Sequence, residues 1–284
     1  MPKQKIQLIL PANLNYSSLV RHVADEVFST AKFDKAWCSR LKLVVDELYM
    51  NAVRYGSTPD KSSVCTTFEY DESGIQFTIE DDGTGVNAIS AEDLKAIIEK
   101  NEANSDLTRT SGRGLAMITK LWTDGVIIGK SRYGGISVGF TKALSTAGEA
   151  PPPPPAPTGL IAKVAAQAAP VPAAPPAKTP PPSPPTPKGP SYEIKLSGEI
   201  DQSNIDEKVA PIYDQIEVMP EEGTLVLDFS DLEYINSTFI GNLASWYTTL
   251  QRKGGRICLK NVNKDIREVL SLVGLLEILE CPVS

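Results

Sequence analysis

Residues 44–56 read VVDELYMNAVRYG, and this stretch decides how the first half of the chain is interpreted. Its apolar residues recur at the spacing of one helix face, which predicts a helix over residues 35–55. Glu47 and Asn51 lie four residues apart, so one helical turn would bring their side chains together at the border of that face. A carboxylate can act as a base, and an amide oxygen is a ligand that magnesium accepts. The competing interpretation of such a pair is a solvated helix edge.

A second motif, IEDDGTGV at residues 79–86, joins a carboxylate to two glycines. The alternating residues before it predict a strand over residues 75–80, so Asp81 stands at a strand end. Gly83 and Gly85 lack side chains and would let the backbone approach a flat ligand closely. An aspartate there can accept a hydrogen bond from the amino group of adenine. The competing interpretation is an ordinary turn, which Asp-Asp-Gly sequences usually form.

A third motif, TSGRGLAM at residues 110–117, places glycines before an apolar helix. Backbone amides at a helix start, free of side-chain crowding, suit a phosphate group. A Gly-x-Gly sequence alone is a weak signal. The order and spacing of the three motifs are more specific than any one of them.

The three motifs in this order resemble the Bergerat-type ATPase fold that histidine kinases and gyrase-type enzymes share, over nearly all of residues 1–145. The helical motif is most similar to that of the anti-sigma-factor serine kinases. The resemblance implies a two-layer α/β sandwich that binds ATP and Mg²⁺. It also implies in-line transfer of the γ-phosphoryl group to a protein hydroxyl, with catalysis by positioning and metal charge.

The same resemblance implies a role for each residue of the site. Glu47 would be the general base for the acceptor hydroxyl, Asn51 would bind magnesium, and Asp81 would recognise adenine. The other implied nucleotide contacts are Gly83 and Gly85 around the adenine, Gly112 and Gly114 closing on the phosphates, and Arg109 and Arg113 stabilising phosphate charge.

Two other enzyme classes fit the sequence poorly. A classical histidine kinase needs a phosphoacceptor histidine on an upstream dimerisation helix, and the chain has only His22, in an ordinary amphipathic helix. A phosphatase of the paired-metal type needs a carboxylate pattern that this sequence lacks.

The chain divides at a proline-rich stretch. Of its 23 prolines, 17 fall between Pro151 and Pro190, in a segment with too little apolar surface to offset its ordering entropy. We therefore expect an ATP-binding domain at residues 1–147, a disordered Pro/Ala-rich linker at 148–190 and a second domain at 191–284. Outside the motifs already named, the predicted elements of the first domain are strands at 6–10, 64–70, 125–130 and 136–141, helices at 16–30 and 91–100, and a helix from Gly114.

The second domain alternates strands with helices, which predicts a small α/β layer structure. The predicted strands are 192–197, 224–229 and 256–259, and the predicted helices are 203–218, one after Ser237, and 264–273. Residues 225–238 read LVLDFSDLEYINST, an apolar strand, a turn, a short strand and a helix start, where Asn236 or Ser237 would be the N-cap.

Residues 190–281 resemble the STAS domains of anti-sigma-factor antagonists, through this stretch and the flanking LSGEID (196–201) and RKGG (252–255) sequences. The resemblance implies that Ser237 accepts a phosphate, with Thr238 as the second choice. Two residues depart from the usual pattern, because an aspartate is replaced by Asn236 and a glycine by Phe239. Both departures bear on how a partner would dock.

Charge and composition exclude several classes of protein. The net charge is −7; residues 1–147 carry 17 Lys/Arg and 18 Asp/Glu, and residues 191–284 carry 8 and 16. No basic stripe exists to meet a nucleic-acid backbone, so direct nucleic-acid binding is not expected. The four cysteines are scattered, and no apolar run of membrane-spanning length occurs. We expect a cytoplasmic protein with reduced thiols that does not bind membranes.

Two functional hypotheses follow. In the first, the chain is an ATP-dependent serine/threonine kinase of a partner-switching system, which phosphorylates its own or another STAS-domain antagonist and controls a sigma factor or analogous regulator. A homodimer is plausible by resemblance. In the second, the chain is a non-catalytic ATP-sensing module with a STAS scaffold. Glu47 favours the first hypothesis, whereas Asn236 and Phe239 favour the second.

Overall fold

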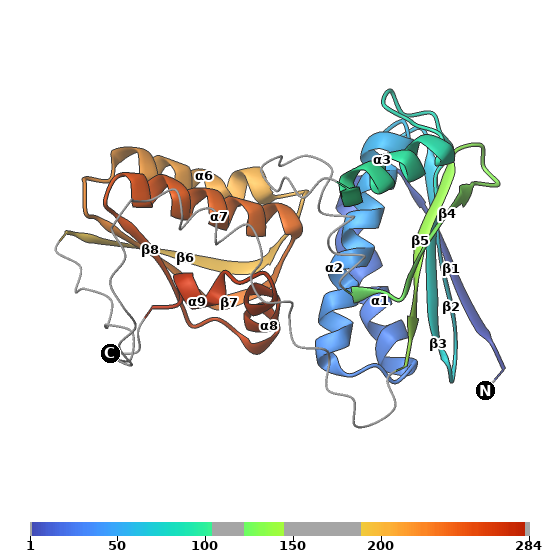
Figure 1. Ribbon diagram of the computed structural model, residues 1–284, viewed down its shortest axis with the longest axis horizontal. Coiled ribbons are helices and arrows are strands. Elements are labelled where there is room, and N and C mark those ends of the chain that lie inside the picture. Colours follow the sequence, from blue (N-terminus) through green and yellow to red (C-terminus); the bar gives the residue numbers. More distant parts are fainter. Residues whose placement is uncertain (1, 104–121, 145–188, 282–284) are drawn as a thin grey trace. The chain divides into compact units, whose positions relative to one another are not determined.

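The computed structural model describes residues 2–103, 122–144 and 189–281. These residues form two compact parts, each with its own sheet, and each part is described by itself (Figure 1). No helix within these ranges is both long enough and apolar enough to cross a membrane.

The first part is built on a five-stranded antiparallel sheet with the strand order β1-β2-β3-β5-β4. Its strands are β1 (Gln4–Pro11), β2 (Ser63–Asp71), β3 (Gly74–Glu80), β4 (Gly125–Lys130) and β5 (Ile136–Ala143). The register places Phe68 opposite Phe77 and Phe77 opposite Phe140. Their ring centroids lie 4.9 and 5.6 Å apart, and all three rings are fully buried. This aromatic row is the centre of the core.

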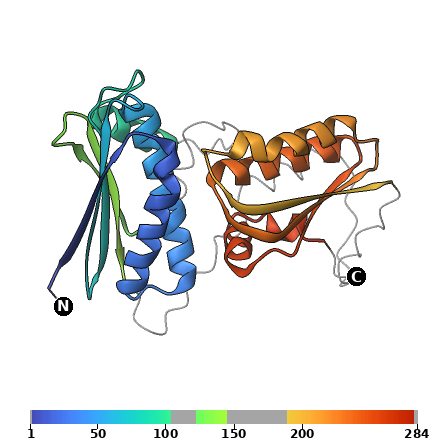
Figure 2. The same cartoon turned by 180° about the vertical axis from the view of Figure 1, so that it is seen from behind.

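Helices cover one face of this sheet (Figures 1 and 2). After a 3₁₀ turn η1 (Leu14–Tyr16), α1 (Ser17–Thr30) and α2 (Lys35–Asn51) pack against each other and over the strands, and α3 (Ala91–Ala103) follows β3. The ring of Phe28 on α1 lies 6.3 Å from that of Phe68 on the sheet. Helices layered on a sheet confirm the predicted α/β sandwich.

The end of α2 differs from the prediction. The α-helix begins after Asp34, whose carboxylate accepts a hydrogen bond from the Trp37 amide at 2.8 Å, and it ends at Asn51. A π-helical turn, η2 (Ala52–Gly56), then continues it, whereas the sequence predicted one regular helix to residue 55. Such wider turns often occur at functional sites, and this one directly follows the predicted magnesium ligand.

The second part is a small layered α/β structure, as predicted. Its sheet has the order β6-β7-β8 and contains β6 (Ser191–Ile200), β7 (Thr224–Ile235) and β8 (Arg256–Lys260), with β7 and β8 parallel. Helices α6 (Ile205–Val218) and α7 (Ser237–Arg252) cover one face, and α8 (Lys264–Leu272) and α9 (Leu276–Leu279) cover the other (Figures 1 and 2). Trp246 of α7 packs edge-on against Tyr213 of α6, with ring centroids 5.5 Å apart.

One predicted break in the second part is wrong. The polar residues after Phe229 predicted a turn, but β7 continues without interruption to Ile235. The Asp228 carboxylate accepts hydrogen bonds from the Ser230 amide at 2.9 Å and from the Asn261 side chain at 2.9 Å, so the turn-forming side chain is bound within an extended strand. The predicted helix from Gly114 and the predicted linker at 148–190, apart from its last two residues, lie outside the described residues.

Candidate functional site

The end of α2 presents the predicted carboxylate and amide on the same side of the helix. The Asn51 side chain donates a hydrogen bond to the Glu47 carboxylate, as the four-residue spacing predicted. Other polar residues of α2 fix how the helix is oriented about its own axis. Asp46 accepts a hydrogen bond from Arg21 of α1 at 2.7 Å and another from Ser17, while the Tyr49 hydroxyl donates to the Asn13 carbonyl at 2.9 Å. Because α1 and the chain after β1 fix these residues, Glu47 and Asn51 have a defined direction.

Asp81 lies at the end of β3 and is only 3% exposed. Its Oδ1 accepts hydrogen bonds from the Gly83 amide at 3.1 Å and from the Ile136 amide at 3.0 Å. Burial raises the pKa of the Asp81 carboxyl above its usual range, and these two amide hydrogen bonds oppose the shift. The carboxylate therefore joins the end of β3 to the loop after it and to the start of β5.

Glycines surround this carboxylate because nothing larger fits. A Cβ atom added at Gly56 would lie 2.1 Å from Asp81 Oδ2, and one added at Gly135 would lie 1.9 Å from Oδ1. Gly56 ends the π-helical turn after Asn51, and Gly135 comes from the turn between β4 and β5. The π-turn thus brings the Glu47/Asn51 end of α2 next to Asp81.

Steric constraints also require glycine at the two positions that the sequence predicted, Gly83 and Gly85. Gly83 has a φ of +69°, a conformation that other residues rarely adopt, and a Cβ at Gly85 would lie 2.1 Å from the Tyr55 carbonyl oxygen. Thr84 between them is anchored, since its hydroxyl donates to Asp82 at 2.8 Å and lies 2.8 Å from the Ser62 hydroxyl. The loop from Asp82 to Gly85 is therefore held against the segment that follows the π-turn.

Gly56 and Gly135 were not among the predicted site residues. Gly56 belongs to the helical motif itself and could have been chosen from it, but Gly135 has no local signal beyond a Gly-Gly turn. A further unpredicted group is Ser57, whose hydroxyl is buried and has no hydrogen-bond partner among the described residues. The predicted phosphate-binding residues Arg109, Gly112, Arg113 and Gly114 lie outside the described residues.

The described residues contain no ready-made metal centre. Across residues 2–103, 122–144 and 189–281, no three or more His, Cys, Asp or Glu side chains are grouped so as to hold a metal ion.

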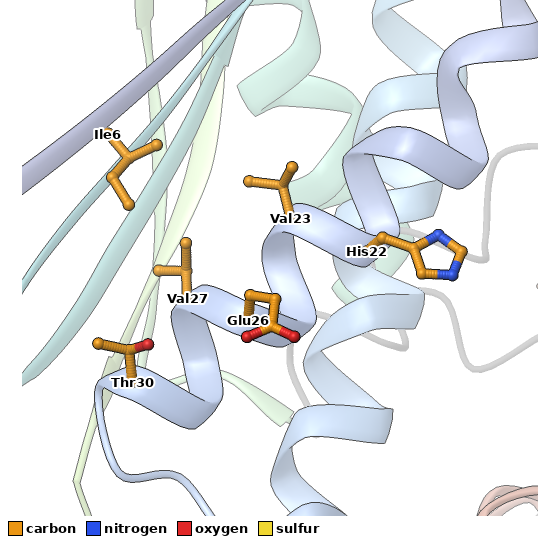
Figure 3. Close-up of a pocket in the computed structure, with 6 residues that line it drawn as sticks. All are labelled: Ile6, His22, Val23, Glu26, Val27 and Thr30. Carbon is orange, nitrogen blue, oxygen red and sulfur yellow. The ribbon is translucent and has the colours of Figure 1, made fainter.

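A shallow apolar depression of about 300 Å³ lies elsewhere on the first part, between β1 and α1 (Figure 3). Ile6, Val23 and Val27 form its floor, and His22, Glu26 and Thr30 lie at its border. None of the predicted site residues lines it. The Nδ1 atom of His22 lies 2.7 Å from the Ser18 carbonyl oxygen of its own helix.

In the second part, Ser237 is the first residue of α7. The preceding Asn236 caps this helix, because its side-chain oxygen accepts a hydrogen bond from the Phe239 amide at 2.9 Å, which confirms one of the two predicted N-caps. The hydroxyl of Thr238 donates to Gln202 at 3.1 Å. Phe239 is fully buried, so the bulky residue that replaces the usual glycine is a core residue.

The close packing of Gly56 and Gly135 against the Asp81 carboxylate can be tested by adding one methyl group. We expect Gly135→Ala to lower the free energy of unfolding of the first part by about 1–3 kcal/mol, because its Cβ would overlap the Asp81 carboxylate. Gly129→Ala, on β4 of the same sheet, is the matched control, since a Cβ there meets no atom within 4 Å. Urea denaturation of the full chain measures both; equal midpoints for the two variants would contradict the close packing described above.

Comparisons with known proteins agree with this architecture. Residues 10–139 match the family described as histidine kinase-like ATPase domain, and residues 188–280 match the family described as Mlab, STAS domain. The chain is 29% identical over 139 residues to the serine-protein kinase RsbW of Staphylococcus aureus strain MSSA476, and 28% identical to RsbW of strain JH9. Each alignment covers 48% of this chain and 85% of the relative.

Among solved structures, the anti-sigma factor antagonist SpoIIAA in its unphosphorylated form is similar, with 23% identity over 34% of this chain and 82% of that one. The TM-score of this match is 0.30. The two family matches confirm the domain types that the sequence motifs indicated. The chain therefore joins a histidine kinase-like ATPase domain, homologous to RsbW, to a STAS domain.

Proposed function

We propose that this chain is an ATP-dependent serine/threonine protein kinase of a partner-switching system, which phosphorylates a STAS-domain antagonist. The observation that carries the proposal is the glycine-lined carboxylate Asp81 beside the Glu47/Asn51 end of α2. The similarity to RsbW, a serine-protein kinase, over 139 residues supports the same activity.

The residues around Asp81 fit an adenine ring. The buried carboxylate keeps its charge partly compensated by the Gly83 and Ile136 amides and can accept a further hydrogen bond from an amino group. Glycine at positions 56 and 135 leaves room for that carboxylate, because a Cβ at either would lie 2.1 or 1.9 Å from one of its oxygens, and the buried Ser57 hydroxyl has no hydrogen-bond partner among the described residues. Together they fit a flat ligand with polar edges.

The Glu47/Asn51 pair would supply the groups that bind the metal and accept the proton. Asn51 would hold magnesium through its amide oxygen, and Glu47 would take the proton from the acceptor hydroxyl. Bound Mg-ATP supplies the phosphoryl group and the metal charge that stabilises its transfer. The packing of Asp46 and Tyr49 keeps α2 from rotating, so the base and the amide are positioned before the nucleotide binds.

Ser237 is our candidate acceptor, in this chain or in another STAS domain. Its hydroxyl stands at the start of α7, and the N-terminus of a helix stabilises a phosphate group. Phosphorylation would add up to about two negative charges to a domain that already has 16 acidic and 8 basic residues. Binding to a positively charged face of a sigma factor or analogous regulator would then change. Thr238 is the alternative acceptor.

A second candidate is a nucleotide-sensing module without phosphoryl transfer, in which the STAS domain is a scaffold. The replacement of the usual aspartate and glycine by Asn236 and Phe239 favours it. The two proposals share the same nucleotide pocket and differ only in whether phosphate reaches a protein hydroxyl.

Labelling with γ-³²P-ATP separates the two candidates. We expect the full chain to become labelled, alone or with an added STAS protein. We expect Glu47→Ala to lower the rate at least about 10²-fold while ATP binding persists, because only proton transfer is lost. Glu92→Ala, an exposed position on α3, is the control. Label lost in Ser237→Ala but retained in Thr238→Ala identifies the acceptor within the chain. An unlabelled wild type that still binds ATP, even with STAS partners present, would support the sensing module.

The pH dependence of binding tests Asp81. Its ionised form accepts the hydrogen bond from adenine, and burial raises its pKa, so protonation begins at a higher pH than for an exposed aspartate. We expect the Kd for ATP to increase as the pH falls towards that pKa. Asp81→Asn should bind more weakly and lose this part of the pH dependence. Calorimetry on both proteins separates the titration of Asp81 from that of the ATP phosphates, because the phosphates titrate in both experiments. Parallel pH profiles of the Kd for the two proteins would exclude a role for Asp81.

A further inference from the structure

An ion pair next to Asp81 holds the turn that carries Gly135. The Arg132 guanidinium donates to Glu80 Oε2 from Nη2 at 2.7 Å and from Nε at 3.0 Å. The backbone amide of Arg132 also donates to Glu80 Oε1 at 3.2 Å. Both oxygens of the Glu80 carboxylate are thus bound to one residue. Charge-assisted hydrogen bonds of this multiple kind fix geometry as well as charge.

Glu80 and Asp81 are adjacent in sequence, and together they bind both ends of the turn between β4 and β5. Glu80 binds Arg132 near the start of the turn, and Asp81 binds the Ile136 amide just after it. Within the turn, the Ser131 amide donates to the Gly135 carbonyl at 2.9 Å. The turn cannot shift along the end of β3 without breaking one of these contacts.

The position of this turn sets the surroundings of Asp81, since Gly135 lies against both the Asp81 carboxylate and Gly83. We infer that Arg132, through Glu80, is a positioning residue for nucleotide binding, which it serves without touching the nucleotide. The inference rests on the proposed function. Since the Arg132 side chain is 52% exposed, its removal leaves the core intact.

The test compares the full chain with Arg132→Ala and Arg132→Lys. We expect Arg132→Ala to raise the Kd and the KM for ATP about fivefold or more while kcat changes little, because ground-state and transition-state binding weaken equally. Lysine keeps the charge with fewer donors and should restore part of the affinity. The control is Lys5→Ala, whose side chain is 53% exposed and pairs with Glu69 at 3.1 Å on the same sheet.

The outcomes are distinguishable. If the wild type does not bind ATP, the proposed function fails. If the wild type binds and Arg132→Ala has the same Kd and KM, the positioning role is wrong. If circular dichroism shows that Arg132→Ala is unfolded, Glu80→Gln replaces it, and an unchanged Kd in that variant overturns the inference.

Discussion

The buried carboxylate of Asp81 is the constraint on which the rest of the first part depends. A charge removed from water must be compensated, and two backbone amides from different segments do this here. This arrangement requires the loop after β3, the start of β5 and the end of the π-turn to meet at the Asp81 carboxylate. Losing these contacts would leave an unpaired buried charge, so the arrangement around Asp81 and the fold are stabilised together.

This constraint explains why the polar pair on α2 lies where it does. The π-turn widens the last turn of the helix and sets Gly56 against Asp81, at a distance that any side chain would prevent. A regular α-helix through the same residues would rotate Gly56 away by part of a turn. The π-helical turn therefore links the end of α2 that carries Glu47 and Asn51 to the Asp81 carboxylate. The contacts that this turn permits offset the conformational cost of its irregular geometry.

The features of this region that can be anticipated from the sequence are the local ones. Glu47 and Asn51 meet because helical periodicity alone brings them together, and Gly83 needs its left-handed conformation within a single loop. Gly135 and Arg132 could not be predicted in the same way. They reach Asp81 and Glu80 only because β5 pairs with β3, a choice of neighbour that no local pattern encodes. The missed continuation of β7 has a similar cause, since Asn261, far along the chain, donates a hydrogen bond to the Asp228 carboxylate, and no local pattern predicts that partner.

The start of α7 bears on how the departure at Asn236 should be interpreted. Asparagine and aspartate cap a helix equally well, and the amide oxygen of Asn236 does so here. An aspartate, however, would add a negative charge next to a phosphate on Ser237, in a domain already rich in acidic residues. The neutral amide keeps the cap and removes this repulsion. The replacement at Asn236, although it departs from the usual pattern, is therefore compatible with a phosphoserine at position 237 in the proposed reaction, and Phe239 is buried in the core.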